Sequence, residues 1–178
     1  WVNQVTASTP SIFFFNRLLT NDIPDETYLE TQKESLGLST MNRFKLVLLD
    51  IDVNFDVARS KRVSATASKL NNKKVHIFPY QGKLLMLMYG SISDDLLAHA
   101  TVMREITQTI YEPFGVPGCI SSVFYNITGL DLAYQQTLVA YQYRPAIMRA
   151  RFADDEFNTE ALVTFEAALM YYLIDNHS

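Results

Sequence analysis

The segment that most restricts the fold of this chain runs from residue 44 to residue 90. Residues 44–51 form an almost continuous apolar run, which is typical of a central strand covered on both faces. Residues 54–70 then have the apolar spacing of a helix. Two short apolar runs, 75–78 and 84–89, meet at the polar pair Gln81-Gly82, which is a hairpin signal. The segment therefore predicts a strand, a helix and a β-hairpin in that order.

The rest of the chain extends this pattern at both ends. Upstream, helical spacing is found in residues 10–19 and 26–36. Downstream we expect a helix from residue 93 to about residue 110, a strand at 118–124, a helix from 129 to about 143, a last strand at 161–165 and a closing helix at 166–174. Two strands joined by a hairpin and flanked by strand–helix units predict an α+β domain, with a mostly antiparallel sheet and its helices on one side.

Composition narrows the class of protein. The chain has 178 residues, of which 48% are hydrophobic and 19% charged, enough for one domain with a sizeable core. A net charge of −4 argues against a chain that itself coats nucleic acid. The single cysteine, Cys119, lies in an apolar run and indicates a buried structural thiol in a reducing, cytoplasmic setting. No run reaches the roughly 18 apolar residues of a spanning helix, so we expect no membrane partner.

Several of these segments together resemble a known family. Residues 44–52 resemble the first strand of GGDEF domains, the diguanylate cyclase family, and residues 75–88 resemble their signature hairpin. Residues 118–140, which include Gly118-Cys119-Ile120-Ser121-Ser122 and Ala133-Tyr134-Gln135-Gln136, are similar to a degenerate GGDEF-like domain. That domain belongs to bacterial transcription regulators of the purine-catabolism and sugar-diacid regulator type. The segments 14–19 and 163–173 also resemble its two ends, so the resemblance covers nearly the whole chain.

The resemblance implies a fold and a domain division. The fold would be that of nucleotide cyclases, a ferredoxin-like βαββαβ core with extra N- and C-terminal helices. Residues 1–40 would be an N-terminal helical segment, 41–160 the GGDEF-like α+β domain, and 161–178 a closing strand and helix. The chain starts at Trp1 rather than methionine, and we expect it to be a segment of a longer protein. Any DNA contact would then be made only by a helix-turn-helix domain outside this chain.

The catalytic residues of the family are not matched. A diguanylate cyclase needs two acids in the hairpin to bind metal and support phosphoryl transfer. With Leu84 at the phenylalanine of the motif, Gly82 and Lys83 stand where those acids would be. Asp50 and Asp52 remain after the first strand, spaced so that both would leave one strand face. We therefore predict no enzyme activity, no metal site and no cofactor.

The same residues leave two interpretations of the former cleft open. Asp50 and Asp52 are either a strand end that reaches solvent or a residual cation site. As a ligand site, the cleft would use Asp50, Asp52, Gln81 and Lys83 to hold a small-molecule effector, a metabolite or a nucleotide. Tyr134 and Tyr141, one heptad apart in a predicted helix, are interpreted as packing or dimer-face residues rather than ligand contacts.

The two ends of the chain carry more apolar surface than one core-facing stripe requires. Phe13 and Phe14 in the first helix and Tyr171 and Tyr172 in the last are the candidate dimerisation residues. The alternative is that the two end helices cover each other within one chain. The main functional hypothesis is a non-catalytic regulatory domain that dimerises and transmits a signal to a helix-turn-helix domain. A small-molecule sensor is the alternative, and a residual cyclase ranks last.

Overall fold

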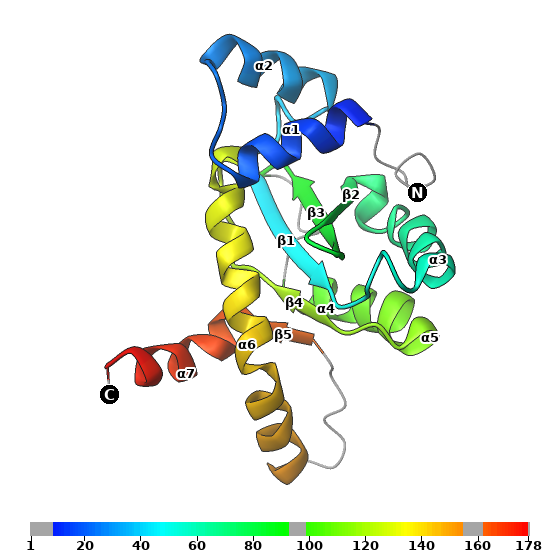
Figure 1. Cartoon of the computed structure of the whole chain (residues 1–178), viewed down its shortest axis with the longest axis vertical. Helices are drawn as coiled ribbons and strands as arrows, with labels where there is room; N and C mark the ends of the chain where they lie inside the picture. The colour runs from blue at the N-terminus through cyan, green and yellow to red at the C-terminus, as the bar shows by residue number, and fades with distance from the viewer. Residues whose placement is uncertain (1–8, 93–98, 155–161, 178) are drawn as a thin grey trace.

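A five-stranded sheet forms the centre of the protein (Figure 1). The computed structural model describes residues 9–92, 99–154 and 162–177. The strand order is β2-β3-β1-β4-β5. Neighbouring strands are antiparallel except β4 and β5, which are parallel. The strands are β1 (Arg43–Leu49), β2 (Val75–Tyr80), β3 (Lys83–Gly90), β4 (Gly118–Ile120) and β5 (Leu162–Thr164). The fold is α+β with a mixed sheet, so the predicted class is confirmed.

Helices precede the sheet, connect its strands and follow it. They are α1 (Thr9–Leu19), α2 (Glu26–Ser35), α3 (Val57–Ala67), α4 (His99–Ile106), α5 (Glu112–Phe114), α6 (Leu130–Asp154) and α7 (Phe165–His177). Short turns η2 (Asn71–Lys73) and η4 (Ile127–Gly129) and the π-helical turn η3 (Thr107–Tyr111) complete the described elements. The start of the helix predicted from residue 93 lies outside the described residues, as does the boundary predicted at 160/161. No helix within the described ranges is long and apolar enough to cross a membrane.

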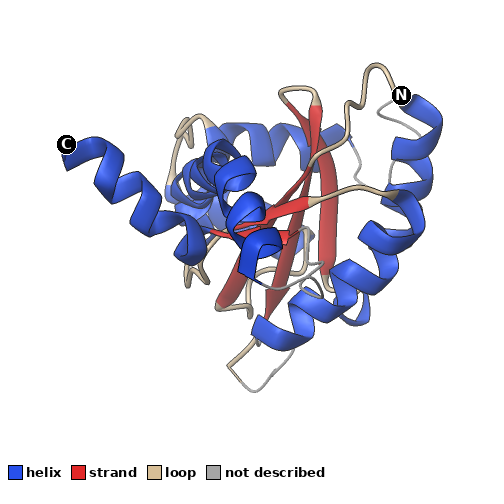
Figure 2. Ribbon diagram, turned by 90° about the horizontal axis from the view of Figure 1, so that it is seen from below, coloured by secondary structure: helices blue, strands red, loops and turns tan. Residues whose placement is uncertain are grey.

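Strand β1 divides the hydrophobic core into two layers. Phe44, Leu46 and Leu48 point into one layer, while Val47 and Leu49 point into the other. Helices α1, α2, α6 and α7 contribute to the first layer, and α3 and α4 to the second. The prediction that the helices lie on one side of the sheet is therefore wrong, because alternate side chains of an apolar central strand all need burial. Figure 2 shows helices on both sides of the strands.

The predicted hairpin is confirmed. Strands β2 and β3 pair antiparallel, and Tyr80 lies opposite Lys83 across the turn. Gln81 and Gly82 have φ angles of 50° and 80°, so both residues of the two-residue turn have the positive φ that tight hairpins require. The carbonyl of Gly82 accepts a hydrogen bond of 2.9 Å from the amide of Val53. This bond holds the hairpin tip against the segment that follows β1.

Two predicted elements have different lengths in the structure. The strand expected at 118–124 ends at Ile120, because the hydroxyl of Ser121, and not a backbone carbonyl, accepts the amide hydrogen bond of Leu46 (2.9 Å). Pairing resumes only at Phe124, which forms an isolated bridge to Phe44. The helix expected to end near residue 143 continues through Pro145 to Asp154.

The turn between α3 and β2 has an unusual backbone. Asn71, Asn72 and Lys73 have φ angles of 53°, 54° and 66°, although residues with a Cβ rarely occupy this left-handed region in succession. The buried side chain of Asn71 donates hydrogen bonds to the carbonyls of Lys74 (2.9 Å) and Tyr89 (3.0 Å). These two bonds hold the turn against the end of β3.

The two end helices lie far apart. Helix α1 packs on the sheet beside α6, whereas α7 packs against the middle of α6 and extends away from the body (Figures 1 and 2). The alternative in which the end helices cover each other is therefore not what the structure has. Each of them needs a separate explanation for its apolar residues.

Candidate functional site

Asp50 and Asp52 lie just beyond the end of β1 and have different partners. Strand β1 ends at Leu49, so the expectation that both carboxylates leave one strand face is wrong. Asp52 folds back on its own loop, where its Oδ1 accepts hydrogen bonds from the amides of Asn54 (2.9 Å) and Phe55 (3.1 Å). This is the local turn that aspartate favours before a helix. Asp52 therefore shapes the loop into α3 rather than sharing a ligand with Asp50.

Asp50 forms an ion pair with Lys83. The Lys83 ammonium lies 2.9 Å from Asp50 Oδ1, and both side chains are partly exposed. The hydrogen bond to Asp50 raises the pKa of the Lys83 ammonium above its ordinary value of 10.5, an effect that partial burial opposes. The ion pair thus joins two of the four predicted ligand residues. Lys83 stands, as a cation, in the place where a bound metal would meet Asp50.

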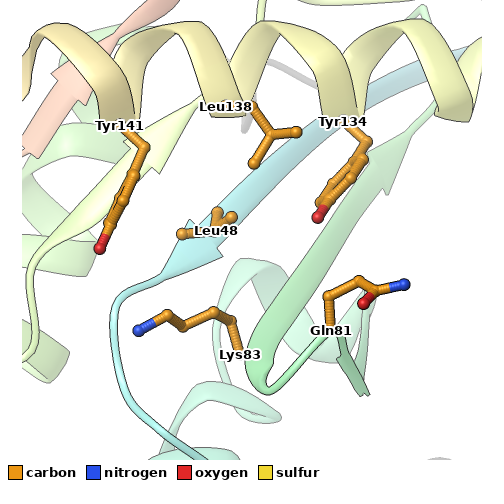
Figure 3. A pocket seen from close by; sticks show the side chains of 6 residues that line it. All are labelled: Leu48, Gln81, Lys83, Tyr134, Leu138 and Tyr141. Carbon is orange, nitrogen blue, oxygen red and sulfur yellow. The ribbon is translucent and has the colours of Figure 1, made fainter.

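A pocket of about 170 Å³ opens beside this ion pair. Helix α6 contributes Tyr134, Leu138 and Tyr141, strand β1 contributes Leu48, and the hairpin contributes Gln81 and Lys83. Figure 3 shows the two tyrosines and Leu138 pointing from α6 toward the strand and the hairpin, with Leu48 between them. The pocket combines apolar walls with a few polar groups at one end, as small-molecule sites do.

The aromatic walls are held by contacts with the hairpin. The Lys83 ammonium lies 6.0 Å from the centre of the Tyr141 ring, and Tyr80 meets Tyr134 edge-on at 5.1 Å. Burial raises the pKa of the Tyr134 hydroxyl further above its ordinary value of 10.0. Its hydroxyl and the Gln81 amide are neutral polar groups that accompany the charged Lys83 at this site.

The size and charge of the pocket limit its chemistry. Sites for cofactors and drug-sized ligands usually enclose about 300–1,000 Å³, so a cavity of about 170 Å³ suits a molecule of one small ring. Within the described residues, no group of three or more His, Cys, Asp or Glu side chains is arranged to hold a metal ion. The arrangement provides one ammonium for an anionic group and two aromatic walls for an apolar one.

Two residues with potentially reactive side chains, Cys119 and His76, have structural roles. Cys119 is buried, and burial raises the pKa of its thiol to about 12, so it is not a thiolate nucleophile. His76 packs between Phe15 and Tyr89, with ring centres 5.5 Å and 5.2 Å away. Its Nε2 donates to the carbonyl of Leu36 at 3.2 Å. His76 thus joins the N-terminal helices to the sheet.

The candidate dimerisation residues differ in how exposed they are. Phe14 is fully buried and contacts Phe15 and Tyr28, so its assignment to a dimer interface is wrong. Phe13 is 55% exposed, although the Arg17 guanidinium covers its ring at 4.9 Å. Tyr171 is half-buried against α6, whereas Tyr172 is exposed on α7. In the described part of the two ends, α7 carries more exposed apolar residues than α1, since Met170, Leu173 and Ile174 are 66%, 42% and 59% exposed.

The sequence indicated the hairpin side of the pocket and missed its α6 side. Tyr134 and Tyr141 were interpreted as packing or dimer-face residues, yet both line the pocket with Lys83. Their heptad spacing showed that they share a helix face. Nothing local showed that this face lies over the hairpin, because about 50 residues separate the two elements.

Comparisons with known proteins assign the chain to no family. No protein-family model matches it, and no curated protein matches its sequence. Among solved structures, it is similar to a regulator of polyketide synthase expression from Bifidobacterium adolescentis, with a TM-score of 0.49 and 20% identity. The match covers 79% of this chain and 52% of that one, so this chain spans about half the length of that regulator. A likeness of this degree carries no argument about activity.

Proposed function

We propose that this chain is a non-catalytic regulatory domain of a bacterial transcription regulator. In this proposal it associates with a second copy of itself and passes a signal to a helix-turn-helix domain outside this chain. The strand order β2-β3-β1-β4, with helices crossing between β1 and β2 and between β3 and β4, supports the GGDEF-like, ferredoxin-like part of the proposal. Two associated copies would set the spacing of two DNA-reading heads on their half-sites.

The ion pair between Asp50 and Lys83 carries the non-catalytic part of this proposal. Phosphoryl transfer from a nucleoside triphosphate depends on divalent cations held by carboxylates, which neutralise the developing charge. Here the Lys83 ammonium lies 2.9 Å from Asp50, and Asp52 is engaged by two backbone amides. A metal at Asp50 would have to displace a cation already bound there. The Lys83 ammonium of the hairpin would repel a divalent cation at the position where a cyclase needs to bind one.

A metal-binding measurement tests this argument. Wild-type protein is expected to bind Mn²⁺ no better than a surface carboxylate does, and to make no cyclic dinucleotide from GTP with Mg²⁺ or Mn²⁺. The Lys83→Met variant keeps the length of the side chain and removes its charge, so Mn²⁺ affinity at Asp50 should rise. Lys69→Met changes an exposed lysine just after α3; it is the matched control and should leave Mn²⁺ affinity unchanged. Cyclic dinucleotide made by pure wild-type protein and abolished by Asp50→Ala would refute the proposal.

A second candidate function is that of a small-molecule sensor, and the pocket beside Lys83 favours it. A ligand with one carboxylate or phosphate and one small ring could compete with Asp50 for the ammonium and pack between Tyr134 and Tyr141. A thermal-shift screen of nucleotides and small metabolites, repeated with Tyr141→Ala, would distinguish the two functions. A ligand that stabilises the wild type and not the variant supports the sensor.

A further inference from the structure

Helix α7 is apolar on two opposite sides. Toward α6 it presents Ala168, which is buried, and Tyr171, which stacks on Tyr143 at 6.1 Å. On the same side, Asp175 accepts a 2.7 Å hydrogen bond from the Tyr143 hydroxyl. A helix that packs on one neighbour needs only one apolar stripe. Helix α7 carries a second one on its outer side.

The outer stripe consists of exposed aliphatic residues. Met170, Leu173 and Ile174 follow the spacing i, i+3, i+4, so they lie on one side of the helix. The eight residues from 167 to 174 carry no charge. Helix α7 extends away from the body of the protein (Figure 2), and the side chains of Met170, Leu173 and Ile174 are 66%, 42% and 59% exposed. The described part of the chain does not cover it.

The stripe continues into a groove between α6 and α7. A pocket of about 160 Å³ lies there, lined by Leu132, Gln135, Gln136, Val139, Phe165 and Tyr172. On the surface of α7, Leu169 lies between Tyr172 in the groove and Leu173 in the stripe, because residues three and four positions apart are neighbours on a helix. Groove and stripe therefore form one apolar surface, here called the α6–α7 surface.

The area of the α6–α7 surface matches what a dimer needs. Five of its residues are between 37% and 66% exposed, namely Leu132, Met170, Tyr172, Leu173 and Ile174. With about 200 Å² for a fully exposed large apolar side chain, they present about 500 Å² per copy. Covering both the groove and the stripe in two copies would bury about 1,000 Å² from these side chains, the lower limit for a specific interface. Exposed apolar patches on monomeric proteins rarely exceed a few hundred Å² unless they have a function.

The residues on the outer side are also arranged for self-pairing. In a two-fold symmetric interface, each contact occurs twice: if residue i of one copy meets residue j of the other, residue j of the first copy also meets residue i of the second. In an antiparallel pair of α7 helices centred between Tyr171 and Tyr172, Met170 meets Leu173 of the second copy, twice. The same centre puts Glu166, whose carboxylate accepts a 2.6 Å hydrogen bond from the Ser122 hydroxyl, near His177 at both ends. Glu166 and His177 are both exposed and lie on the same side as Met170 and Leu173.

We infer that two copies of this chain associate through antiparallel pairing of α7 on the α6–α7 surface. Ile174 of each copy then lies beside Leu169 of the other, at the edge of the 160 Å³ groove, which has the size of an apolar side chain. The inference rests on the proposed function for the role of the dimer but not for its existence. It specifies which surface associates and in which orientation.

Sedimentation velocity at micromolar concentration tests the surface. The 178-residue protein is expected to be a dimer. Leu173→Glu buries two unpaired carboxylates at the centre of the interface and should weaken dimerisation at least about 100-fold. The matched control is Phe55→Glu, the same change at an aromatic residue that is 91% exposed in the loop after β1. It should leave the dimer intact, and circular dichroism would show that both variants fold.

Cysteine cross-linking tests the orientation. In the antiparallel pair, Met170→Cys and Leu173→Cys variants should form disulfides rapidly when mixed and slowly when either is alone. Parallel helices would instead link each variant to itself, which would overturn the inference. A strictly monomeric wild type, or a dimer that Leu173→Glu leaves unchanged, would overturn it too. If the Leu173→Glu variant still dimerised, self-association and the proposed function would stand, and only the α7 surface would be ruled out. Cyclic dinucleotide synthesis by the wild type would instead refute the proposed function and leave the α7 pairing intact.

Discussion

Gly118 is the position where one added methyl group should disturb the sheet most. It lies in β4, between β1 and β5, where a Cβ atom would be 2.9 Å from Leu162 Cδ2 and 3.3 Å from Val47 Cγ1. Both neighbours are fully buried, so neither can move into solvent. Overpacking of this kind costs about 1–3 kcal/mol. We therefore expect Gly118→Ala to lower the free energy of unfolding by about 2 kcal/mol, which corresponds to a fall in Tm of about 4–8 °C for a chain of this length.

Thermal and urea unfolding of matched variants check the steric explanation. Gly129→Ala is the control, since its nearest neighbour, Phe124 Cδ2, is at an ordinary contact distance of 3.5 Å. It should change stability by less than about 0.5 kcal/mol. In the double variant with Leu162→Ala the clash is gone, so the two changes should couple favourably by at least about 0.5 kcal/mol. Equal losses for the two glycine variants, or strict additivity with Leu162→Ala, would refute the reasoning.

Two further predictions concern stability. Burial lowers the pKa of His76 in the folded protein below 6.5, and the hydrogen bond to Leu36 opposes this only partly. At pH values between the His76 pKa of the folded protein and that of the unfolded chain, the unfolded chain binds more protons than the folded protein does. The free energy of unfolding should therefore fall as the pH falls through this window, and it should fall less in the His76→Gln variant. Lys73→Gly should raise stability by about 1 kcal/mol, because glycine takes the φ of 66° without strain; urea unfolding that shows a loss would contradict this.

Local patterns in the sequence were sufficient for the elements near the hairpin. The pair Gln81-Gly82 can adopt positive φ at both turn positions, so the turn and the antiparallel pairing of its strands follow from a few neighbouring residues. The apolar run of β1 similarly indicated a strand buried on both faces. The expectation of helices on one side failed because the connectivity of strands and helices does not say which face each helix covers.

The candidate site could be predicted only in part, for a related reason. Asp50 and Lys83 were both singled out, but their ion pair joins residues 33 positions apart and depends on the register of β1 against β3. The α6 wall depends on how a helix 50 residues further along is placed over the hairpin. Such placement is decided by the packing of the whole core, which no local window contains.

The sequence by itself determined most of the strand and helix segments, the tight turn between β2 and β3, and the absence of an acidic residue from the hairpin tip at residues 80–83. Those features depend on residue type and on spacing within a few turns or strands. Only the tertiary structure decided that Phe14 is buried, that Lys83 neutralises Asp50, and that α7 extends from the body with an apolar outer side. The sequence of an apolar helix is the same whether its own chain or a second copy covers it. The hydrophobic effect is non-directional, so the pattern shows that the helix needs burial but not which surface buries it.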